Sequence, residues 1–148
     1  SSRAGLLLAA LTAAQVVGAF GVLPVTWRGI DRRWALIATL SILLVGLVGV
    51  GVAPEGLPWV WMVLMGLGLG GAFPLALVLP LDYARTPLEA GGLTALGFGV
   101  GLLVGSVTPW GIGYLRDVTG SFDVAVLALI GLTVIKLGLA ATFRPPRA

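Results

Sequence analysis

Residues 56–81 read GLPWVWMVLMGLGLGGAFPLALVLPL, a stretch without a single charged side chain. Crossing the hydrocarbon core of a bilayer takes a helix of about 20 predominantly apolar residues, so this stretch is long enough to span a membrane. In lipid, a continuous apolar segment must satisfy its own backbone hydrogen bonds, and a helix does so within one segment. The stretch therefore predicts a transmembrane helix.

Four further apolar runs surround this one, and only Lys136 interrupts any of them. The expected spans are residues 4–27, 34–54, 56–81, 90–115 and 124–143. The runs are rich in Leu, Ala and Gly and lack the alternation that is typical of strands. Mean hydropathy is +1.08, and 10% of the residues are charged, against about 25% in soluble domains. The sequence thus predicts an all-α integral membrane protein, a single transmembrane domain of five helices.

An odd number of spans places the two termini on opposite sides, and the basic residues are divided unevenly between these sides. One side carries Arg3 and Arg116, and the other carries six arginines. The six are Arg28, Arg32, Arg33, Arg85, Arg144 and Arg147. Because cytoplasmic loops carry the excess of basic residues, we expect the C-terminus in the cytoplasm and the N-terminus outside the cell membrane. An outside N-terminus without a signal-peptide pattern favours a chain that is part of a longer protein.

The glycines of MGLGLGGAF, residues 65–73, match the dinucleotide-binding spacing G-x-G-x-x-G. That fingerprint needs a preceding strand and a turn, whereas these glycines lie inside an apolar run, so their context argues against a phosphate site. Glycines four residues apart share one helix face, where they allow two helix backbones to approach closely. The residues expected to pack in this way are Gly66, Gly70, Gly97, Gly101 and Gly105. Pro74 and Pro109 are expected to kink their helices, as irregularities of packing or as parts of a transport site.

Polar side chains within the spans are few. Gln15 and Thr12 lie one turn apart on one face, and they predict either a polar cavity lining or a hydrogen bond between helices. Lys136 lies near the inner end of the last span, where we expect it to extend to the cytoplasmic headgroups rather than to contact a solute. The chain has no His and no Cys, and its spans contain no carboxylate. The sequence therefore argues against an enzyme and predicts no catalytic residue, metal, cofactor or nucleic-acid partner.

Two motifs resemble the major facilitator superfamily of transporters. WRGIDRR, residues 27–33, resembles the basic cytoplasmic loop that recurs in each half of that superfamily. GFGVGLLVGSVTPWGIGYLRDVTGSF, residues 97–122, resembles the eleventh helix and the following link of the cyanate/nitroimidazole-type transporter group, with Asp117, Thr119 and Gly120 in the link. Gln15, Gly18 and Pro24 are similar to the eighth helix of the group. The resemblance implies helices eight to twelve, a partial C-terminal half of a twelve-helix fold.

A transporter of this kind would move a small solute, such as a small organic anion, across the cytoplasmic membrane by alternating access. Its partners would be membrane lipid, the solute and the missing N-terminal helices, without which this chain is not expected to transport. The substrate-cavity candidates are Thr12, Gln15, Phe73, Thr94, Phe98 and Trp110. The candidates for a cytoplasmic gate link are Arg28, Asp31, Arg32 and Arg33. The alternative is a small non-transporting scaffold protein that assembles through its glycine ridges.

Overall fold

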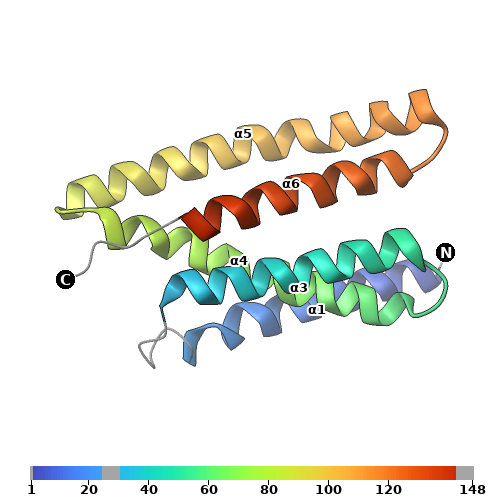
Figure 1. The fold of residues 1–148 in the computed structure, drawn as a ribbon, viewed down its shortest axis with the longest axis horizontal. Helices are drawn as coiled ribbons and strands as arrows, with labels where there is room; N and C mark the ends of the chain where they lie inside the picture. The colour runs from blue at the N-terminus through green and yellow to red at the C-terminus, as the bar shows by residue number, and fades with distance from the viewer. Residues whose placement is uncertain (1, 25–30, 143–148) are drawn as a thin grey trace.

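The computed structural model describes residues 2–24 and 31–142, which contain five long helices (Figure 1). These are α1 (Ser2–Gly21), α3 (Arg32–Val52), α4 (Pro58–Tyr83), α5 (Pro87–Thr119) and α6 (Asp123–Thr142). Each of the five is long and apolar enough to cross a membrane. The predicted all-α membrane fold with five spanning helices is therefore confirmed.

The ends of the helices differ from the ends of the charge-free runs. Helix α1 ends at Gly21, short of the expected residue 27, and residues 25–27 lie outside the described part of the chain. Helix α5 extends beyond the expected residues 90–115 at both ends. The Thr86 hydroxyl accepts the Glu89 N–H at 3.2 Å, and Gly120, at φ 70°, donates its N–H to the Arg116 carbonyl at 2.8 Å. Both ends are thus set by capping residues, and charged residues are accommodated within the helix.

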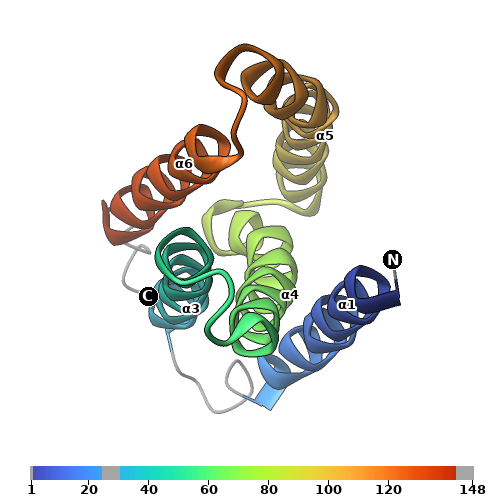
Figure 2. The same ribbon diagram turned by 90° about the vertical axis from the view of Figure 1, so that its right-hand side faces the viewer.

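Helix α4 lies between α1 and α3 and contacts both along its length (Figure 2). Its glycines are the points of closest approach. A Cβ on Gly70 would lie 2.7 Å from the Cα of Gln15 in α1, and a Cβ on Gly68 would lie 2.7 Å from the Cα of Leu43 in α3. Gly66 faces α1 in the same way. The missing side chains are what allow three helices to pack backbone to backbone.

Helix α3 packs on its other side against α6. A buried apolar cluster joins α3, α4, α6 and the residue that follows α1; it consists of Val22, Ala35, Leu36, Leu40, Leu75 and Ala140. The Arg33 guanidinium donates to the carbonyl oxygen of Ala141. Since the last four carbonyls of a helix have no partner within it, this hydrogen bond ties the start of α3 to the end of α6.

Helix α5 lies on the outside of the bundle, next to α6 and the end of α4 (Figure 2). It is 33 residues long, and none of its described side chains is buried. At 1.5 Å per residue it measures about 50 Å, which exceeds a hydrocarbon core of about 30 Å. A helix of this length can cross the core and keep the charged residues near its ends outside the hydrocarbon.

Candidate functional site

A cavity of about 490 Å³ lies between α4, α5 and α6. Its walls are mostly apolar and include two polar side chains, Thr94 of α5 and Lys136 of α6. The other lining residues are Phe73, Ala76, Leu77, Gly97, Phe98, Gly101 and Leu102. The volume of the cavity lies within the roughly 300–1,000 Å³ of small-molecule sites, but so do the volumes of open grooves on other faces, so the feature that sets this half-open cavity apart is its lining by three helices.

Three of the six residues predicted to line a substrate cavity meet here, namely Phe73, Thr94 and Phe98. The rings of Phe73 and Phe98 are in contact, with centroids 6.1 Å apart and planes at 77°. This edge-to-face arrangement is favourable for aromatic pairs and links α4 to α5 across the cavity wall. Thr94 lies one turn from Phe98 along α5, so the two residues share one face of the helix.

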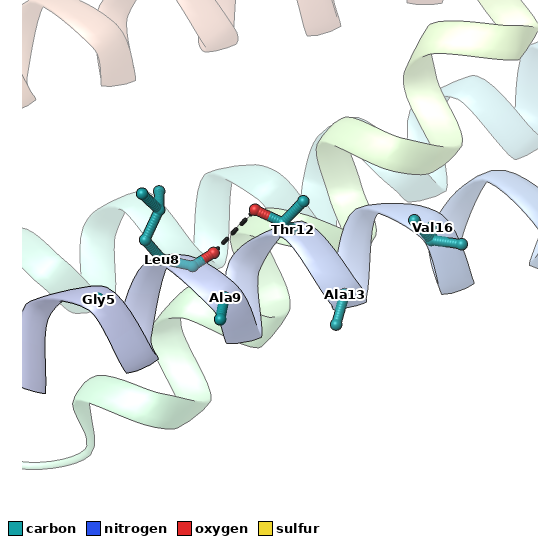
Figure 3. A pocket seen from close by; sticks show the side chains of 6 residues that line it. All are labelled: Gly5, Leu8, Ala9, Thr12, Ala13 and Val16. Carbon is teal, nitrogen blue, oxygen red and sulfur yellow. Dashed lines mark hydrogen bonds between the residues drawn. The ribbon is translucent and has the colours of Figure 1, made fainter. Parts of the chain in front are cut away.

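The other three predicted cavity residues lie elsewhere. Thr12 lines a shallow groove made by α1 alone, and its hydroxyl donates to the Leu8 carbonyl at 2.9 Å (Figure 3). Gln15 lies on the face of α1 that packs against Gly70, and its backbone makes that contact. Trp110 lies exposed on α5 with its ring stacked on Tyr114, at a centroid distance of 5.9 Å. The structure thus does not gather these three with the cavity, and their role as solute contacts stays a prediction.

Lys136 is the polar residue of this cavity that sequence reasoning left out of the site. Its position near the end of α6 favoured an ammonium group that extends to the headgroups; the structure places Lys136 in the cavity wall, and the headgroup contact stays a prediction. The signal available in the sequence was its isolation, because a lone cation within a spanning helix is a functional candidate by default. What the sequence did not contain was the position of α6 relative to α4 and α5.

The proposed gate link lies at the end of the bundle where α3 begins, and Arg28 falls outside the described residues. Asp31 is the N-cap of α3, and its carboxylate accepts the N–H of Arg33 at 3.1 Å. Arg33 bonds the end of α6, and its guanidinium carbon lies 5.9 Å from the ring centroid of Trp34. Asp31 and Arg33 therefore have structural partners here, and a gating role for the link stays a prediction.

The link motif with Asp117, Thr119 and Gly120 lies at the C-terminal end of α5. The Thr119 hydroxyl donates to the Leu115 carbonyl at 2.6 Å and lies 3.1 Å from the carbonyl of Ser121. Gly120 supplies the only positive φ in the described chain. Gly120 is the C-cap of α5, and Thr119 and Gly120 together explain the sharp turn into α6. Asp117 lies in the last turn of α5, and its role in the link motif stays a prediction.

The predicted packing glycines divide into two sets. Gly66 and Gly70 lie against α1, as described above. In α5 a Cβ on Gly97, Gly101 or Gly105 would meet no described atom within 4 Å. The stripe on α5 is therefore open within the described chain, and its packing role stays a prediction. Pro74 and Pro109 lie inside helices that continue on both sides of them, and their role as kinks stays a prediction too.

Two curated transporters are similar to nearly the whole chain. The cyanate transport protein CynX of Escherichia coli (strain K12) is 41% identical over 140 residues, which are 92% of this chain and 36% of that protein. The uncharacterized transporter YycB of Bacillus subtilis (strain 168) is 27% identical over 137 residues, 91% of this chain and 34% of that protein. No protein-family model and no solved structure matches. The chain thus spans about a third of the length of these relatives, and the resemblance inferred from the sequence is confirmed.

Proposed function

We propose that this chain forms part of a secondary transporter of the major facilitator superfamily, which moves a small organic anion across the cytoplasmic membrane by alternating access. The observation that carries the proposal is the identity of 41% to a protein named for cyanate transport, over 92% of the chain. The structure supports it with five helices of spanning length and a cavity of small-molecule size between three of them. Cyanate is accordingly the first solute to test.

The proposal assigns the five helices to positions eight to twelve of a twelve-helix transporter. The remaining helices would supply the other half of the solute pathway, since the chain spans about a third of its relatives. The open face of α5, with its glycine stripe, is where such helices could approach closely. Membrane lipid, the solute and these helices are thus the proposed partners.

The proposal is tested by uptake of labelled cyanate into proteoliposomes that contain the complete transporter. We expect saturable uptake that unlabelled cyanate competes away, and no uptake into protein-free liposomes. Liposomes with the 148-residue chain alone are the matched control, and we expect them to behave like protein-free ones. A complete protein that inserts and folds but takes up nothing would favour the scaffold alternative.

The orientation has its own test, because the chain contains no cysteine and each introduced one is unique within it. Glu55 lies exposed in the link between α3 and α4, and Arg85 lies exposed in the link between α4 and α5. The excess of arginines on the Arg85 side predicts that this side is cytoplasmic. In intact cells, a membrane-impermeant maleimide should label a Glu55→Cys variant and spare an Arg85→Cys variant until the cells are permeabilised. The reverse pattern would contradict the proposed orientation.

A further inference from the structure

Arg33 lies in the first turn of α3, where a positive charge is unfavourable for the helix to which it belongs. The aligned peptide dipoles place partial positive charge at a helix N-terminus, so this turn favours acidic side chains and disfavours basic ones. The first turn of α3 contains no acidic residue, and Arg33 follows Arg32 at its start. The cap residue Asp31 offsets part of this cost, since its carboxylate accepts the Arg33 N–H at 3.1 Å. A favourable partner outside α3 would explain the position of Arg33.

That partner is the C-terminal end of α6. Helix α3 begins at the end of the bundle where α6 finishes, and the two helices are in contact (Figure 1). The Arg33 guanidinium donates to the carbonyl oxygen of Ala141, which lies in the last turn of α6. This end of a helix carries partial negative charge and carbonyls without a partner in the helix, so a cation is favourable there. The last turn of α6, up to Thr142, contains no basic residue of its own, and Arg33 of α3 places a cation there.

The surroundings of the guanidinium hold it in this position. Its Nε atom is buried, so this part of the group is shielded from water, and its charge is screened less than that of a fully exposed arginine. The guanidinium carbon lies 5.9 Å from the ring centroid of Trp34, at the distance of a cation–π contact. Close by in the sequence, Ala35 of α3 and Ala140 of α6 are buried members of one apolar cluster. A polar contact and an apolar cluster thus join the same two helix ends.

We propose that Arg33 is a fixed clamp, which caps α6 from the first turn of α3 and holds these two helix ends together in every state of the transporter. An arginine suits this role, because its guanidinium is always charged and its N–H groups can donate to the last carbonyls of a helix. Arg33 is then not among the residues of the gate link that separate during transport, and α3 and α6 move as one unit. The persistence of the clamp through transport rests on the proposed function, whereas the capping of α6 does not.

Charge reversal distinguishes a clamp from a residue that serves α3 alone. In Arg33→Glu the first turn of α3 gains the acidic residue that it favours, whereas the carbonyl end of α6 gains a repulsive charge. We expect this variant to lower the Tm of the complete transporter in detergent by about 2–4 °C, and Arg33→Gln to lower it by less. Arg3→Glu is the matched control, because Arg3 is exposed in the first turn of its own helix, α1, and its reversal should leave the Tm unchanged or raise it. A Tm that Arg33→Glu leaves unchanged or raises would overturn the clamp.

Cross-linking tests whether the two helix ends stay together. Trp34 and Ala141 are exposed, and Ala141→Cys keeps the backbone carbonyl to which Arg33 donates. The double variant Trp34→Cys/Ala141→Cys, in a complete transporter without other cysteines, is treated with a short flexible bismaleimide in the presence and in the absence of cyanate. We expect the same high yield of linked peptides by mass spectrometry in both conditions. Uptake into proteoliposomes after cross-linking should stay near the uptake before it, and the two single-cysteine variants control for attachment of the reagent alone.

The outcomes separate the clamp from the transport function. A cross-link that stops uptake, where neither single attachment does, would show that the two helix ends must separate, and it would overturn the clamp. A yield that cyanate changes strongly, or a folded protein without linked peptides, would overturn it too. A complete transporter that takes up no cyanate in any form would overturn the proposed function, whereas the Tm of Arg33→Glu and the cross-linking yield would still decide the clamp.

Discussion

Replacing Gly70 with Leu is expected to destabilise the pair of α1 and α4 severely, by about 3 kcal/mol or more. A Cβ at this position would lie 2.7 Å from the Cα of Gln15, and the Gln15 carbonyl lies nearer still. Backbone atoms cannot rotate away as a flexible side chain can, so the two helices must separate to accommodate Leu. Separating the helices also breaks the neighbouring contact at Gly66, where the backbone of α1 approaches α4 in the same way.

The matched control is the same replacement at Gly105, in the glycine stripe of α5. A Cβ there meets no described atom within 4 Å, and Leu has a higher helix propensity than Gly. Unfolding of this chain in detergent by added SDS, followed by tryptophan fluorescence, should shift strongly for Gly70→Leu and little for Gly105→Leu. Equal shifts for the two variants would contradict the assignment of α4 as the tightly packed helix.

Replacing Gly97 with Phe is expected to abolish most solute uptake by the complete transporter while leaving its fold intact. Gly97 lines the cavity between α4, α5 and α6, and a Cβ there meets nothing within 4 Å. A Phe side chain can therefore extend into the space proposed for the solute without a clash. Uptake should fall at least about tenfold, which corresponds to about 1.4 kcal/mol.

Gly113→Phe is the control for this experiment, since Gly113 lies on the same helix, is equally open and does not line the cavity. Initial rates of uptake are compared at equal amounts of inserted protein, with Tm as the measure of folding. Normal uptake by Gly97→Phe would show that the solute does not pass through this cavity. A lower Tm in Gly97→Phe, with an unchanged Tm in Gly113→Phe, would show instead that other parts of the complete protein fill the cavity.

Much of the fold follows from the lengths of the apolar runs. A segment of spanning length in lipid has no regular alternative to a helix unless it belongs to a closed barrel, so five runs predict five helices. The ends were harder to predict, because the expected runs stopped at charged residues. Arg116 and Asp117 lie inside α5, which continues to its cap at Gly120. Capping chemistry, which the sequence also contains, is the better guide to such an end.

The site was less predictable, because it depends on which helices are neighbours. Phe73, Thr94 and Phe98 meet as expected, whereas Thr12 bonds its own helix and Trp110 stacks on Tyr114. A Thr or an aromatic residue within a helix has the same polarity whether it faces a solute cavity or contacts its own helix, so the sequence does not separate the two cases. The distance of Lys136 from the end of α6 fits a headgroup contact and a cavity contact equally well, so the expected headgroup contact stays a prediction.

Solute counterflow distinguishes an alternating-access transporter from a channel and from a scaffold protein. Proteoliposomes that contain the complete transporter are loaded with unlabelled cyanate and diluted into a trace of labelled cyanate. We expect the labelled cyanate inside the vesicles to rise transiently above its external concentration. The reason is that an alternating-access carrier exchanges unlabelled cyanate from inside for labelled cyanate from outside, and the unlabelled excess inside keeps the label from being carried back out. Label that only equilibrates, or that never enters, would contradict alternating-access transport of a small anion.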